Sequence, residues 1–87
     1  MKVEGLTALI TGGASGLGAG AARVLSGAGV RCALLDRNLD LARQLAAELG
    51  GIALGCDVVD AAGVNAAIAQ TSAKLGTPRI LLNAAGI

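Results

Sequence analysis

Short apolar runs alternate along this chain with segments whose apolar residues recur at helical spacing. The runs cover residues 6–11, 30–35, 51–56 and 79–82, and Arg31 is a charged residue inside the second of them. Nearly continuous apolar runs of this length are typical of strands that are buried on both faces of a sheet. We therefore predict a strand at each of these positions.

The segments between the runs carry helical patterns. Their recurring positions are Leu17, Ala21, Val24, Leu25 and Ala28, then Leu41, Leu45 and Leu49, and then Val64, Ala67, Ile68, Thr71 and Leu75. Asn38 and Asp60 are good N-cap residues, because a side-chain oxygen there accepts from unpaired N–H groups of the first helical turn. Gly29, Gly50 and Gly76 follow the patterns and predict their ends.

The predicted order is βαβαβαβ, which indicates parallel strands joined by right-handed helical crossovers. We expect an α/β fold, a Rossmann-type doubly wound parallel sheet with strand order 3-2-1-4. The 87 residues suit one domain unit. We interpret residues 1–87 as the N-terminal dinucleotide-binding half of a single Rossmann domain. Such folds normally continue beyond their fourth strand. The elements predicted here end with the fourth strand, so we expect its outer edge to be unpaired.

Composition narrows the classes of partner. The chain is 54% hydrophobic yet has no Phe, Tyr or Trp, so its core must consist of Ala, Val, Leu and Ile. Its net charge is +1 with both signs interspersed. Without a basic face or aromatic rings that stack on bases, we expect no nucleic-acid partner. No apolar run is long enough to cross a membrane, and no signal-peptide pattern is present, which favours a cytoplasmic protein.

The two cysteines, Cys32 and Cys56, both lie in apolar runs. The chain has no His, and the cysteines form no cluster with metal-ligand spacing, so we predict no metal site. Small buried hydrophobic residues are the interpretation that fits both positions.

The turn after the first strand reads Thr-Gly-Gly-Ala-Ser-Gly-Leu-Gly over residues 11–18 and leads into a helical pattern. A turn that binds phosphate needs backbone N–H groups aimed at the anion with no Cβ in the way. We assign this role to Gly12, Gly16 and Gly18, with the Ser15 hydroxyl as a further donor. The alternative is a glycine-rich turn with a purely structural role, which the strand–turn–helix setting disfavours.

A Walker-type phosphate loop would require Lys followed by Ser or Thr after its last glycine. Gly18 is followed by Ala19 and Gly20. The Walker interpretation is therefore excluded.

Asp36 ends the second predicted strand, 20 residues after Gly16. A carboxylate at this position accepts hydrogen bonds from the adenosine ribose hydroxyls of NAD and repels the 2′-phosphate of NADP. Arg37 is a complication, because a guanidinium can pair with that phosphate, but no basic residue in the glycine turn supports it. We therefore predict NAD as the cofactor and disfavour NADP. Asp36 could instead cap the next helix, although Asn38 is better placed for that.

Asp57 and Val58 follow the third predicted strand. In a doubly wound sheet this loop lies at the carboxyl edge, near the expected adenine. Asp57 could accept from the adenine amino group, and Val58 could pack on the ring. An ordinary loop acid explains Asp57 equally well.

Together these features resemble the short-chain dehydrogenase/reductase family. The resemblance rests on the residue 11–18 turn, on Asp36, on the pair Asp57 and Val58, and on Asn-Ala-Ala-Gly at residues 83–86. Within the family, residues 5–18 look most like type 2 3-hydroxyacyl-CoA dehydrogenases.

The resemblance implies a role for each matching position. The residues expected around the pyrophosphate and its neighbouring ribose are Gly12, Ser15, Gly16, Leu17 and Gly18. Asp36 would hold the adenosine ribose, and Asp57 with Val58 would contact adenine. Asn83 would stabilise the central strand, while Ala84 and Gly86 would line the cofactor near its nicotinamide-side ribose.

The resemblance also implies an NAD-dependent oxidoreductase that transfers hydride between NAD and a secondary alcohol. Its substrate would be a small alcohol or ketone or an acyl-CoA such as 3-hydroxyacyl-CoA, and it would form a homo-oligomer. The Ser, Tyr and Lys with which the family performs catalysis have no matching positions here, and the chain has no Tyr. We therefore predict no catalytic residue among these 87.

Two alternatives remain open from the residues. The chain could be a binding module that captures a nucleotide without chemistry. It could also self-associate through the unpaired edge of its fourth strand.

Overall fold

The computed structural model describes residues 2–14, 16–55 and 61–84. The strands are β1 (Thr7–Thr11), β2 (Arg31–Asp36), β3 (Ile52–Gly55) and β4 (Ile80–Asn83), and the helices are α1 (Gly16–Gly27), α2 (Leu39–Leu49) and α3 (Ala61–Leu75). They follow the predicted βαβαβαβ order, and each strand lies within one residue of its predicted apolar run wherever the structure describes it.

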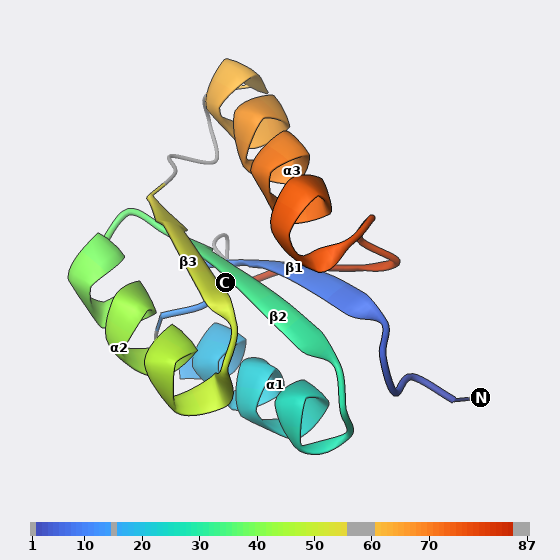
Figure 1. Ribbon diagram of the computed structural model, residues 1–87. Helices are drawn as coiled ribbons and strands as arrows, with labels where there is room; N and C mark the ends of the chain where they lie inside the picture. Colours follow the sequence, from blue (N-terminus) through green and yellow to red (C-terminus); the bar gives the residue numbers. More distant parts are fainter. Residues whose placement is uncertain (1, 15, 56–60, 85–87) are drawn as a thin grey trace.

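The strands form one parallel sheet in the order β3-β2-β1-β4. Thr7 pairs with Arg31 at the start of β1, while Thr11 pairs with Leu35 and with Asn83 at its end. The α/β doubly wound fold and the strand order 3-2-1-4 are thereby confirmed. This register brings the carboxyl ends of β1, β2 and β4 to one edge of the sheet, where the glycine turn begins (Figure 1).

Successive residues of the two central strands supply opposite faces of the sheet, as the two-residue period of a strand requires. Ala8, Ile10, Cys32 and Leu34 pack with α1 and α2 in the larger core cluster. Leu9, Ala33 and Leu35 belong to a second cluster on the face covered by α3. Figure 1 shows the resulting layers, with α1 and α2 on one side of the sheet and α3 on the other.

The caps of α2 form as predicted. The side chain of Asn38 accepts a hydrogen bond from the amide of Leu41, and Gly50 terminates the helix with its amide bonded to the carbonyl of Ala46. Cys32 is buried, as predicted. Cys56 and the predicted cap Asp60 lie outside the described residues.

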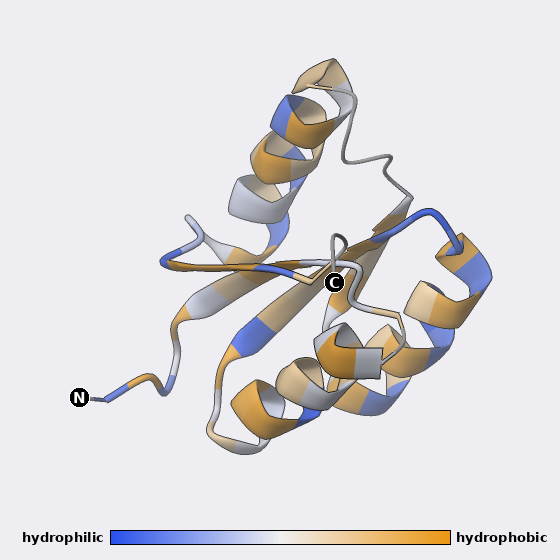
Figure 2. Ribbon diagram, turned by 180° about the vertical axis from the view of Figure 1, so that it is seen from behind, coloured by the Kyte–Doolittle hydropathy of each residue, from blue (hydrophilic) through white to orange (hydrophobic). Residues whose placement is uncertain are grey.

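The first helix meets the sheet through its small residues. Gly18 and Ala22 are its buried positions, whereas Leu17 is 65% and Val24 is 73% exposed. The apolar pattern of residues 17–28 thus predicts the helix correctly but not its covered face, because Gly18 and Ala22 are not among the recurring positions. Hydrophobic positions are spread over α1 as well as the strands (Figure 2).

β4 lies at the outer edge of the sheet that the described residues form. Leu81 in this strand is 70% exposed. Together with Leu17 and Val24 of α1, Leu81 lines an apolar groove of about 580 Å³. We call this surface the α1–β4 groove.

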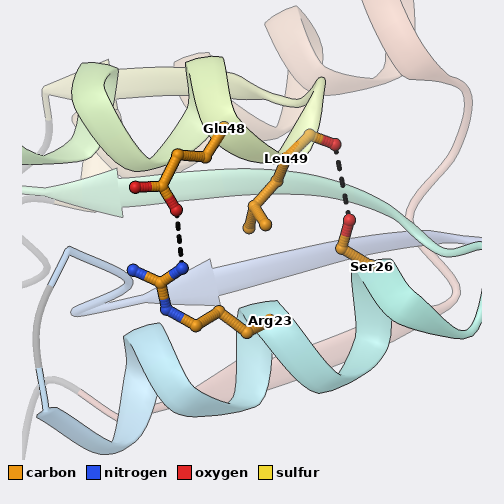
Figure 3. Close-up of polar contacts among 4 residues, drawn as sticks. All are labelled: Arg23, Ser26, Glu48 and Leu49. Atoms are coloured by element: carbon orange, nitrogen blue, oxygen red, sulfur yellow. Dashed lines mark hydrogen bonds and ion pairs between the residues drawn. The ribbon is translucent and has the colours of Figure 1, made fainter.

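The helices α1 and α2 are tied together at the surface. Arg23 Nη1 forms an ion pair with Glu48 Oε2 at 2.6 Å, and the Ser26 hydroxyl donates to the carbonyl of Leu49 at 3.4 Å (Figure 3).

In the described parts of the chain, no helix has the length and apolar character needed to span a membrane.

Candidate functional site

The glycine turn starts as an extension of the sheet. The amides of Gly12 and Gly13 both donate to the carbonyl of Leu35 in β2, at 2.7 and 3.3 Å. The backbone then takes a positive φ at Gly12 (66°) and again at Gly16 (56°), where α1 begins. A side chain at either position would be strained. These glycines are therefore what allows the chain to turn sharply from strand to helix.

Gly18 is required for a different reason. A Cβ built on Gly18 would overlap the carbonyl oxygen of Gly12 and would lie 2.8 Å from its carbonyl carbon. Gly13 is tightly enclosed as well, because its Cβ would lie 3.1 Å from the Ile10 carbonyl oxygen and from a methyl group of Leu34. The absence of side chains lets the first turn of α1 press against the end of β1.

The carboxylate of Asp36 joins two loops at the end of β2. Its Oδ2 accepts a hydrogen bond from the amide of Ala14 at 3.0 Å, and its Oδ1 accepts from the amide of Asn38 at 2.9 Å. Ala14 belongs to the glycine turn, and Asn38 begins α2. Each carboxylate oxygen keeps further acceptor capacity, so the side chain can accept from a ligand without releasing either amide.

Asn83 closes the site on the β4 side. The Thr11 hydroxyl donates to Asn83 Oδ1 at 2.7 Å, and the amide of Ala84 donates to the carbonyl of Thr11 at 3.0 Å. Thr11 is buried. These bonds tie the carboxyl ends of β1 and β4 together beside the glycine turn.

The electrostatic setting of the turn favours an anion. The first turn of α1 contains no acidic residue, and its unpaired N–H groups carry the positive end of the helix dipole. The acid facing the described turn is Asp36, whose two oxygens are already engaged by backbone amides. A phosphate at the start of α1 would therefore meet amide donors.

The predicted site residues divide into two groups. The structure brings Gly12, Gly16, Leu17, Gly18, Asp36, Asn83 and Ala84 to one edge of the sheet, at the ends of β1, β2 and β4. The predicted positions Ser15, Asp57, Val58 and Gly86 lie outside the described residues. In the described chain, no group of three or more His, Cys, Asp or Glu side chains is placed to hold a metal ion.

Sequence reasoning missed three participants. It assigned no role to the Thr11 hydroxyl, to the buried Gly13, or to the amide that Ala14 donates to Asp36. Thr11 could have been found from its position at the last residue of a parallel strand next to Asn83. The contact between Ala14 and Asp36 has no sequence signal, because it joins residues 22 positions apart.

The glycine turn and its neighbours share three structural features with Rossmann folds. The close approach at Gly18 leaves no room for a Cβ, a helix begins directly after the turn, and a carboxylate stands at the end of the neighbouring strand. These are the features of the first βαβ unit of Rossmann folds. The fold and the glycine turn define a Rossmann-type α/β unit.

Comparison with known proteins identifies the family. The family model for short chain dehydrogenases matches residues 6–87, so the chain belongs to the short chain dehydrogenase family. D-threitol dehydrogenase from Mycolicibacterium smegmatis is 43% identical over 91 residues, which cover 99% of this chain and 35% of the relative.

Two solved structures have the same fold. 3-Ketoacyl-(acyl-carrier-protein) reductase from Brucella melitensis, complexed with NADH, superimposes with a TM-score of 0.87 at 36% identity over 91% of this chain and 34% of that one. The structure of ribose-5-phosphate isomerase from Brucella melitensis 16M superimposes with a TM-score of 0.90 at 35% identity, and the match covers 99% of this chain and 34% of that one. The chain therefore spans about a third of the length of these relatives.

Proposed function

We propose that this chain is the N-terminal dinucleotide-binding half of an NAD-dependent oxidoreductase, with residues 1–87 forming part of a single Rossmann domain. The observation that carries the proposal is the packing of Gly18 against Gly12 at the start of α1, next to the carboxylate of Asp36. Family membership and the NADH complex of the related reductase support a nicotinamide cofactor.

We propose roles for the individual residues. Gly12, Gly16 and Gly18 leave space for the pyrophosphate against backbone N–H groups, with Ser15 as a further donor and Leu17 beside the adjoining ribose. Asp36 accepts from the adenosine ribose, and Asp57 with Val58 contacts adenine. Asn83 holds the end of β4, and Ala84 and Gly86 line the nicotinamide side of the cofactor.

Asp36 also underlies the choice of NAD over NADP. The 2′-phosphate of NADP would approach the carboxylate that already accepts from Ala14 and Asn38. Like charges at contact distance repel, and no basic side chain lies in the turn at residues 11–18 to compensate. Exposed Arg37 extends from the same strand end, and its single charge does not remove the repulsion.

The bound cofactor would supply the chemistry, which is the transfer of hydride to or from carbon. The part played by these residues is to bind the cofactor and fix its orientation. For the whole protein we propose a soluble, cytoplasmic, homo-oligomeric enzyme acting on a secondary alcohol or its ketone. The resemblance to type 2 3-hydroxyacyl-CoA dehydrogenases makes 3-hydroxyacyl-CoA one candidate substrate, and the related D-threitol dehydrogenase makes a polyol another.

Calorimetric titration of the chain with NAD and with NADP tests the cofactor assignment. NAD should bind at least tenfold more tightly than NADP, and Asp36→Ala should reduce that preference. Asp40→Ala, which removes the same charge from the first turn of α2, should keep the preference of the wild type. Tighter binding of NADP by the wild type would overturn the role given to Asp36. The activity proposal fails if the full reading frame binds NAD yet oxidises none of a 3-hydroxyacyl-CoA, a polyol and a simple secondary alcohol.

A second candidate function is self-association without chemistry, which the α1–β4 groove favours. Strand edges with exposed apolar side chains pair readily with a second copy. Sedimentation of the chain at increasing concentration should show dimers that Leu81→Lys abolishes. A monomer at all concentrations would exclude this candidate.

A further inference from the structure

We propose that Asp36 positions the glycine turn as well as recognising ribose, so that its carboxylate couples the two halves of the nucleotide site. The ligand part of this inference rests on the proposed nucleotide-binding function. The contact with the turn is a property of the free chain and can be tested without any ligand.

The glycine turn is held to β2 by consecutive amides. Gly12 and Gly13 donate to the carbonyl of Leu35, and Ala14 donates to Asp36 Oδ2. The first two bonds need only backbone, whereas the third depends on a side chain. Among the described hydrogen bonds between the turn and β2, the bond from Ala14 to Asp36 is also the nearest to the start of α1 at Gly16. Removing the carboxylate therefore frees the segment that leads into the proposed phosphate site.

The other oxygen of the carboxylate gives it a fixed orientation. Asp36 Oδ1 accepts from the amide of Asn38 at 2.9 Å, and the side chain of Asn38 in turn caps α2. A side chain engaged at both oxygens loses its freedom to rotate. The amide of Ala14 is thus linked through Asp36 to the start of the second helix, and the spacing between the two loops is set by one carboxylate.

This arrangement makes ribose recognition and turn geometry interdependent. An ionised carboxylate has about four lone-pair sites, so the ribose hydroxyls can use those that the amides leave. A 2′-phosphate that repels Asp36 would also push the carboxylate away from the amides of Ala14 and Asn38. Selection against NADP would then include lost amide bonds in addition to charge repulsion. Variants that neutralise Asp36 to accept NADP should weaken phosphate binding at the same time.

Amide hydrogen exchange of the free protein tests the positioning role directly. In Asp36→Ala, the amide of Ala14 should exchange about tenfold faster or more, because it loses its acceptor. Amides in β1 such as that of Ile10 should be unchanged, and Asp40→Ala should leave Ala14 as in the wild type. Asp36→Asn keeps one side-chain acceptor and should give intermediate protection. Equal exchange of Ala14 in the wild type and Asp36→Ala would overturn the inference.

A pair of nucleotides separates the two roles in the bound state. ADP offers both ribose hydroxyls to Asp36, whereas 2′,3′-dideoxy-ADP offers none. A carboxylate that only recognises ribose would leave dideoxy-ADP binding unchanged, or tighter through loss of negative charge, when Asp36 becomes Ala. We expect instead that Asp36→Ala binds dideoxy-ADP about three- to tenfold more weakly than Asp40→Ala does. For ADP the loss of affinity should be about 30-fold or more, which is in the range of hydrogen bonds to charged groups.

The outcomes distinguish the two proposals. If the wild type binds neither nucleotide, the proposed function fails, and the exchange of Ala14 still decides the positioning role. If the wild type binds both nucleotides but Asp36→Ala leaves the affinity for dideoxy-ADP unchanged, the positioning role fails and the proposed nucleotide binding stands.

Discussion

Gly18, in the first turn of α1, lies so close to Gly12 that a Cβ on Gly18 would overlap the carbonyl oxygen of Gly12. That carbonyl lies in the same planar peptide unit as the amide of Gly13, which donates to the carbonyl of Leu35. The carbonyl therefore cannot rotate away without breaking the pairing with β2. The contact fixes the start of the helix against the end of the strand.

Gly18→Ala should consequently destabilise the chain by about 2–3 kcal/mol, as over-packing against backbone does, and should weaken NAD binding at least tenfold. Gly20→Ala is the matched control, because a Cβ there meets nothing within 4 Å. It should be neutral or stabilising by up to about 1 kcal/mol, since Ala favours helix over Gly. Urea unfolding and calorimetry measure the two effects. Equal stability of the two variants would contradict the close contact.

The Thr11–Asn83 hydrogen bond should couple β1 to β4. Thr11→Val keeps the shape of the side chain but removes the hydroxyl that donates to Asn83 Oδ1. A cycle of Thr11→Val, Asn83→Ala and the double variant should give a coupling free energy of about 0.5–1.5 kcal/mol. Additive effects would show that this bond makes no net contribution. Thr77→Val, at an exposed position, controls for the general effect of the substitution.

Cys32 should be an unreactive thiol in the folded chain. It is 2% exposed, and burial raises the pKa of its thiol above the ordinary value of 9.0. Since the thiolate is the reactive form, iodoacetamide should label Cys32 at least tenfold more slowly than in the urea-unfolded chain. Peptide mass spectrometry separates its labelling from that of Cys56. Equal rates in the folded and unfolded chain would contradict its burial.

The same pKa shift gives a direction for stability against pH. A group whose pKa is raised on folding stabilises the protein below its unfolded pKa, and this contribution is lost as pH rises through the folded value. The free energy of unfolding should therefore fall above about pH 9. In a Cys56→Ser background this fall should be smaller in Cys32→Ala, which has no thiol to ionise. An identical fall in both proteins would assign it to other groups.

The Arg23–Glu48 ion pair should contribute little to stability. Both side chains are more than half exposed, at 56% and 58%, and exposed pairs of this kind are worth about 0–1 kcal/mol. Glu48→Gln should lower the free energy of unfolding by less than about 1 kcal/mol at low salt, and by less still in 1 M NaCl. A larger, salt-independent loss would mean that the pair has a packing role.

Much of the fold could be predicted from the chain alone, because its signals are local. The apolar runs place the strands, and Asn38 and Gly50 mark the ends of α2 where the structure has them. The covered face of α1 could not be predicted. Leu17 and Val24 belong to the predicted helical pattern and Ala22 does not, yet Ala22 is buried and the other two are exposed. Which side of a helix meets a sheet depends on how closely the backbones approach, and here Gly18 sets that approach.

The site divides in the same way. Residue types and spacing by themselves determined that a glycine turn follows the first strand and that a carboxylate ends the second, since both depend on positions close in the chain. The hydrogen bonds from Ala14 to Asp36 and from Thr11 to Asn83 are visible in the three-dimensional structure alone. These pairs are 22 and 72 residues apart. The parallel register brings them together by aligning the carboxyl ends of the strands, and short-range pattern carries no information about such contacts.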